Sequence, residues 1–213
     1  MDGDSNDEIT EFLKKAQEIR IAIDVMKRNT EEVKKLYSIM LSLPHGNDHN
    51  NSEVEDRKMV ISQTATQIRK RLKEIENDMP EDEDDEDQSQ LSRIKRIQFP
   101  TLVCLFAETV KEYYEVLSKY QERYKAMVCQ QLKINNIFLT VDKSATDEEL
   151  QDLLDKEGTA LFVDNIVADT LQAQQLLANV KERHEDLLKI ENSVREVRDM
   201  FVQMATLMET QVG

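Results

Sequence analysis

The 213-residue chain contains no tryptophan, only four glycines, three prolines and two cysteines. Scarce glycine and proline leave few tight turns, which argues against a sheet protein or an enzyme with a loop-lined pocket. Cys104 and Cys129 lie 25 positions apart in helical sequence, so they indicate neither a disulfide framework nor a zinc site. These shortages favour long helices in a reducing, cytosolic setting.

The sequence also lacks the usual signatures of membrane insertion and catalysis. No signal peptide is evident, and no apolar run approaches the roughly 20 residues that a bilayer-spanning helix needs. There is no glycine-rich phosphate loop and no plausible nucleophile–base pair, so we expect no enzyme activity and no cofactor. His45 and His49 flank Asp48 in a polar loop, where no helix fixes a ligand geometry, so a solvated loop is a better interpretation than a metal site.

Acidic residues outnumber basic ones by 43 to 28, which gives a formal net charge of −15. This charge disfavours nucleic acid and anionic lipid as partners and favours basic protein surfaces. Seven consecutive acids, Glu81–Asp87, follow Pro80. Their mutual repulsion and the absence of apolar residues predict a solvated connector and not a cation site.

Three long amphipathic helices are predicted in residues 8–43, 51–79 and 91–131, the first stopped by Pro44 and the third containing Pro100. The buried face of the first helix is expected to comprise Phe12, Ala16, Ile19, Ile23, Met26, Thr30, Val33, Tyr37 and Met40. Helices of similar length with short connections favour an antiparallel up-down three-helix bundle.

The second predicted helix carries a basic cluster: Arg69, Lys70, Arg71 and Lys73. A phosphate or lipid patch is one interpretation of it. The neighbouring Glu74 and Glu76 favour the alternative, an ordinary charged helix face.

A segment of different character, residues 132–170, follows the third helix. Thr146 and Glu149 form a capping box that opens a short helix ending near Lys156. The apolar patch of this helix is Leu150, Leu153 and Leu154. An exposed patch of this kind predicts that the segment packs on another part of the protein.

A fourth long helix is predicted from Leu171, and it carries a narrow apolar stripe with alternating steps of three and four. The stripe comprises Leu187, Ile190, Val194, Val197, Phe201, Met204 and Met208, and the next position in the same register is Gln211. This spacing is typical of a coiled coil with one buried polar layer, and so narrow a stripe needs partner helices to leave water. The chain stops two residues later, which we interpret as a cut inside the motif.

The run His184–Gln211 closely resembles the first half of the SNARE motif of plasma-membrane-type syntaxins, with Gln211 at the polar zero layer. Two earlier regions resemble the first and third helices of the regulatory (Habc-like) domain of that family. These are Glu18–Arg20 with Asn29–Lys34, and Tyr120–Arg123 with Gln131–Leu132. A generic coiled coil would account for the stripe alone but not for these other regions.

The resemblance implies a three-helix regulatory domain at 8–131, a linker at 132–170 and a truncated SNARE motif at 171–213. The fourth helix would be able to pack on the bundle in a closed form, with Leu150, Gln151, Leu153 and Leu154 of the linker acting as a clamp. No basic N-terminal peptide that docks a regulator is evident in Met1–Glu8.

The same resemblance implies a SNARE protein of vesicle docking and fusion in exocytosis, regulated by an SM-family (Sec/Munc-type) protein. Its other partners would be SNAP-type and vesicle SNARE helices. The intact protein would lie on the cytoplasmic face of the plasma membrane through a C-terminal anchor, whereas this fragment would be soluble. The alternatives are a spectrin-type helical scaffold and a curvature-sensing membrane binder. Both predict stable homodimers, whereas a closed syntaxin-like chain should be a monomer.

Overall fold

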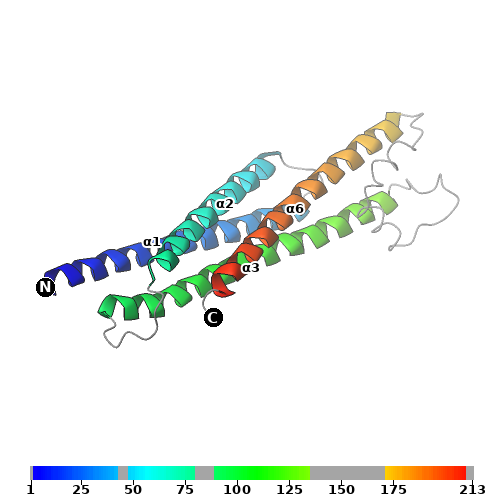
Figure 1. Ribbon diagram of the computed structural model, residues 1–213. Helices are drawn as coiled ribbons and strands as arrows, with labels where there is room; N and C mark the ends of the chain where they lie inside the picture. Colours follow the sequence, from blue (N-terminus) through cyan, green and yellow to red (C-terminus); the bar gives the residue numbers. More distant parts are fainter. Residues whose placement is uncertain (1, 43–47, 80–88, 135–170, 210–213) are drawn as a thin grey trace. The chain divides into compact units, whose positions relative to one another are not determined.

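The computed structural model describes residues 2–42, 48–79, 89–134 and 171–209, and every regular element within these ranges is an α-helix (Figure 1). The helices are α1 (Asp2–Ser42), α2 (Asp48–Asn77), α3 (Gln90–Ile134) and α6 (Leu171–Glu209). The predicted all-α class is confirmed. The first helix begins at Asp2, six residues before the predicted Glu8.

Local side chains account for where α3 begins. The Ser89 hydroxyl accepts a hydrogen bond from the backbone N–H of Ser92 at 3.2 Å, which is the usual N-cap arrangement. Pro100 lies inside the helix, as predicted, and its ring is exposed. α3 therefore forms one element, with its start set by a cap and not by the proline.

The chain divides into two compact units, of which the first comprises Met1–Val116 and Val197–Gly213. Within it, α1 and α2 lie side by side (Figure 1). Arg71 forms an ion pair with Glu18 at 3.1 Å, and Arg57 donates to the Asn29 side chain at 3.3 Å. Since the α2 residue number falls as the α1 number rises, the two helices are antiparallel.

The first part of α3 runs in the same direction as α1. Lys95 lies 6.0 Å from the ring centroid of Phe12, and further along Arg20 donates to Gln98 at 2.9 Å. Residue numbers therefore rise together on the two helices. With the antiparallel α2, this gives the predicted up-down-up arrangement.

The core of the first unit consists of large apolar side chains that are removed from water. Those from α1 to α3 with less than 2% of their surface exposed are Ile19, Met26, Val33, Ile61, Ile68, Leu72, Phe99, Leu102, Phe106 and Val110. The predicted buried face of α1 is confirmed except at Met40, which is half-buried. Thr30 is tolerated there because its hydroxyl donates to the Met26 carbonyl at 3.0 Å. One large apolar side chain of α3, Ile97, lies outside this core and is 68% exposed.

The second unit comprises Leu117–Glu196, and its described parts are the end of α3 and the start of α6. Its buried apolar side chains come from both helices: Leu117, Tyr120, Tyr124, Val128, Leu187 and Ile190. Each such side chain contributes about 1.5–3 kcal/mol on burial. The start of the predicted SNARE stripe thus belongs to the core of this unit.

Candidate functional site

The candidate site is the face of α6 that carries the predicted stripe. In the second unit Leu187 and Ile190 are buried and Val194 is half-buried; in the first unit Val197 and Met204 are buried and Phe201 is half-buried. Two large apolar side chains outside the stripe are exposed, Leu188 at 46% and Val202 at 65%. Alternating steps of three and four keep the stripe on one side of the helix, and that side faces protein instead of water.

Two predicted residues of the stripe have no described side chain. Met208 lies in α6, but its side chain falls outside the described part of the structure, and Gln211 lies beyond it altogether. The predicted linker clamp, Leu150, Gln151, Leu153 and Leu154, also lies outside the described residues, as does the acidic run Glu81–Asp87. The roles of these residues therefore stay predictions.

An aromatic pair joins the stripe to α3 within the first unit. The rings of Tyr114 and Phe201 meet edge to face, with centroids 6.0 Å apart and planes at 86°. This geometry brings the positive edge of one ring to the negative face of the other, and such pairs contribute about 0.5–1.5 kcal/mol beyond their buried area. Phe201 is thus held by a specific partner on the bundle.

A buried polar residue, Ser193, lies beside the stripe and is 5% exposed. Its hydroxyl donates to the Lys189 carbonyl of the same helix at 2.9 Å, so it needs no partner on another helix. The seven-residue repeat does not predict that this position is buried. A straight helix has 3.6 residues per turn, so its buried side drifts from a strict seven-residue repeat and reaches positions beside the stripe.

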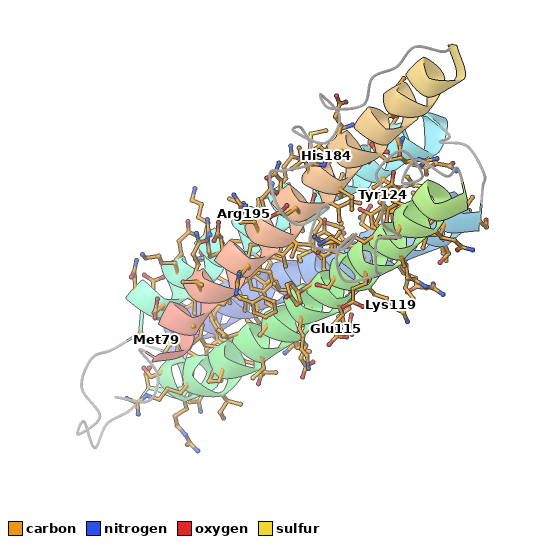
Figure 2. All side chains as sticks on the ribbon, turned by 90° about the vertical axis from the view of Figure 1, so that its right-hand side faces the viewer. Met79, Glu115, Lys119, Tyr124, His184 and Arg195 are labelled. Atoms are coloured by element: carbon orange, nitrogen blue, oxygen red, sulfur yellow. The ribbon has the colours of Figure 1, made fainter. Side chains whose placement is uncertain are left out.

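A polar cluster in the second unit connects α3 with α6 beside the start of the stripe. Figure 2 labels its member on α3, Tyr124. The Tyr124 hydroxyl donates to Asp186 Oδ2 at 3.0 Å and accepts from Arg183 Nη1 at 3.3 Å. The Arg183 guanidinium also lies 5.9 Å from the centroid of the Tyr124 ring, within the range of a cation–π contact. Lys189 pairs with Asp186 at 3.5 Å on the same helix.

Burial sets the ionisation of the two tyrosines at this position. It raises the pKa of Tyr124 above the ordinary value of 10, and the negative charge of Asp186 raises it further, while Arg183 opposes the change. Burial likewise raises the pKa of Tyr120, with Tyr124 and Asp186 adding to the effect. Both phenols are therefore protonated at neutral pH, and Tyr124 keeps the proton that it donates to Asp186.

No sequence pattern described above singles out Tyr124, Arg183 or Asp186 as part of a polar cluster. A signal was present, because Arg183 lies seven residues before Ile190 and so falls in the register of the stripe. A charged side chain at such a position requires a polar partner when it leaves water. The identity of that partner, 59 residues away in sequence, follows only from the fold.

The basic cluster and the two cysteines noted in the sequence lie in described helices. Of the basic cluster, Arg71 pairs with Glu18 of α1, which fits a charged helix face. Cys104 is exposed and Cys129 is half-buried, and the two form no disulfide with each other. Within the part of the chain that is described, no three His, Cys, Asp or Glu side chains gather closely enough to hold a metal. In that same part no helix combines the length and the apolarity required to cross a membrane.

Comparison with known proteins adds two findings. The family model described as Syntaxin matches residues 6–166. The fold is similar to that of a chain in the crystal structure of the Unc18-syntaxin 1 complex from Monosiga brevicollis, with a TM-score of 0.71 and 22% sequence identity. That match covers 95% of this chain and 83% of the other, so the structural likeness extends over nearly the whole chain.

Proposed function

Since this chain belongs to the syntaxin family, we propose that it acts as a Q-SNARE in vesicle docking and membrane fusion, of the kind that drives exocytosis. The family consists of trafficking proteins that assemble with other helices and are not enzymes. The spectrin-type scaffold is set aside, because a syntaxin model accounts for residues 6–166.

The observation that carries the proposal is the burial of the stripe against the chain's own helices. Val197 is 1% exposed and Met204 2% exposed, so the face that would join a parallel bundle of SNARE helices is already covered. One face cannot occupy both places, and the intramolecular packing therefore competes with assembly. We interpret this arrangement as a closed, autoinhibited form.

A small free-energy difference between the closed and open forms is enough to inhibit assembly. A closed form that leaves about 1% of molecules open requires an advantage of about 2.7 kcal/mol. Burying two of the stripe side chains, at about 1.5–3 kcal/mol each, supplies that amount. The proposed linker clamp, Leu150, Gln151, Leu153 and Leu154, would add to it. Gln211 would form the polar layer that penalises misaligned partners.

The proposed regulator is an SM-family protein, because the related syntaxin of known structure is in a complex with Unc18. The proposed assembly partners are SNAP-type and vesicle SNARE helices. The site of action would be the cytoplasmic face of the plasma membrane.

Two substitutions that introduce a charge on α6 test whether the stripe is the face that joins the SNARE complex. The parent chain mixed with SNAP-type and vesicle SNARE helices should form a mixed helical complex, detected by size-exclusion chromatography and circular dichroism. Val197→Asp should abolish the complex, because it places a charge in the apolar seam. The matched control Val202→Asp, at a position 65% exposed, should leave it intact. Equal assembly by both variants would refute the proposal.

Regulator binding is tested separately by isothermal titration of the chain with an SM-family protein. We expect a one-to-one complex with a chain that is monomeric on its own. A chain that forms stable homodimers and ignores the SM protein would instead support a scaffold function.

A further inference from the structure

We propose that Tyr124, Arg183 and Asp186 form a polar latch that fastens the first part of α6 to α3 and must open before the stripe can pair from its N-terminal end. The latch is a structural property of the second unit. Its effect on assembly rests on the proposed function and deepens it, since it concerns regulation of the same helix face.

The hydrogen bonds of the Tyr124 hydroxyl provide the first argument. This hydroxyl uses its single proton toward Asp186 and a lone pair toward Arg183, at 3.0 and 3.3 Å. The tyrosine is 3% exposed, so water would not replace a partner that moved away while α3 and α6 stayed packed. A buried hydroxyl left without a partner is costly, and the cluster therefore separates as a whole or not at all.

The position of Arg183 in the heptad register provides the second argument. Because it precedes Ile190 by seven residues, Arg183 would point into the layer above Leu187 in a bundle with other SNARE helices. It cannot point there and keep its contacts with the Tyr124 hydroxyl and ring. Release of this arginine is thus a required step when pairing begins at that end.

The latch also selects one register of α6 on α3. A shift by one turn would move Asp186 and Arg183 away from Tyr124 by about 5.4 Å and leave the phenol facing Glu182 or Lys189. Apolar packing of Leu187 and Ile190 tolerates such a shift far better, because dispersion contacts are not directional. The polar cluster therefore supplies positional precision that the stripe lacks.

Hydrogen exchange of the full chain tests the latch without any partner. Tyr124→Phe removes one oxygen and keeps the ring, so amides of Glu182–Ile190 should exchange about tenfold faster, equivalent to about 1.4 kcal/mol of opening free energy. Amides of α1 and α2 should be unaffected. The matched control is Tyr114→Phe, which removes a hydroxyl from the same helix and leaves the ring facing Phe201; it should exchange like the parent.

A double-mutant cycle separates a latch from general packing. Asp186→Ala should speed exchange as Tyr124→Phe does, whereas Glu185→Ala, at the exposed neighbouring position, should not. Combining Tyr124→Phe with Asp186→Ala should add little to either single change, because both break the same hydrogen bond. Unchanged exchange in Tyr124→Phe, or fully additive effects, would overturn the proposal.

The two proposals fail in different ways. If Tyr124→Phe speeds exchange and also speeds association with partner SNARE helices, both stand. If exchange speeds up while association is unchanged or absent, the latch exists but the proposed competition with assembly is wrong. If association occurs at the parent rate and exchange is unaltered, the latch is wrong and the SNARE function stands.

Discussion

Tyr114 of α3 meets Phe201 of α6 edge to face, with ring centroids 6.0 Å apart. The tyrosine belongs to the bundle and the phenylalanine to the stripe. The contact therefore helps to hold the candidate SNARE face on the bundle. A substitution of Tyr114 removes it without changing any residue of the stripe.

We expect Tyr114→Ala to loosen the end of α6 by about 1–3 kcal/mol, from the lost aromatic pair and the lost buried area. Amide exchange of Val197–Met204 should accelerate by about tenfold or more, and association with partner SNARE helices should become faster. Lys111→Ala, at an exposed site one turn earlier on α3, is the control. Parent-like exchange in Tyr114→Ala would show that this pair does not hold the helix.

The core of the first unit predicts a second outcome. Leu72→Ala removes a fully buried side chain of α2 and should lower the free energy of unfolding by about 2–5 kcal/mol. Leu13→Ala, the same change at a position 45% exposed, should lower it by about 1 kcal/mol or less. Urea unfolding monitored by circular dichroism distinguishes them. Similar values for the two variants would contradict the assigned core.

The third prediction concerns the buried side-chain amide of Asn29. Asn29 donates to the Val25 carbonyl at 2.8 Å and accepts from Arg57 of α2, whose guanidinium also reaches Glu53 at 3.3 Å. Asn29→Ala should destabilise the chain by about 1–3 kcal/mol, because Arg57 loses its acceptor at the α1–α2 contact. Asn192→Ala, at an exposed position of α6, should be neutral or slightly stabilising, since alanine favours helix. Thermal melts of both variants give the comparison.

The raised pKa of Tyr124 predicts a pH dependence. Its folded pKa lies above the unfolded value of about 10, so the phenol contributes stability that is complete below pH 10 and is lost as the pH rises through the folded pKa. The parent should melt at a higher temperature than Tyr124→Phe at pH 8, and the two melting temperatures should converge above pH 10. Parallel curves across this range would argue against a protonated, buried donor.

The linker supplies a prediction that concerns residues outside the described structure. If Leu150 and Gln151 clamp the linker on the bundle, then Leu150→Ala with Gln151→Ala should raise the open population many-fold, because a truncated buried leucine costs about 2–5 kcal/mol. Exchange from Leu187 to Met208 should accelerate while α1 and α2 stay protected. Slow exchange in the double variant would show that the clamp does not operate.

The sequence by itself determined the helices and which side of each is buried. The α1 face from Phe12 to Tyr37 and the α6 positions Leu187, Ile190, Val197 and Met204 follow from apolar residues spaced three or four positions apart, a local property of the chain. The polar residue on the buried face of α1 also has a local cause, because the Thr30 hydroxyl bonds to its own helix.

Only the tertiary structure decided which helix faces meet and in which register along the helix axes. The contacts of Arg20 with Gln98, Tyr124 with Asp186 and Tyr114 with Phe201 join residues 62 or more positions apart. Apolar periodicity states that a face is buried but not against what, because the hydrophobic effect is proportional to area and indifferent to direction. Directional contacts, edge-to-face rings and hydrogen bonds to a buried hydroxyl, select one arrangement from many that bury similar area, and these contacts exist only once the helices are packed.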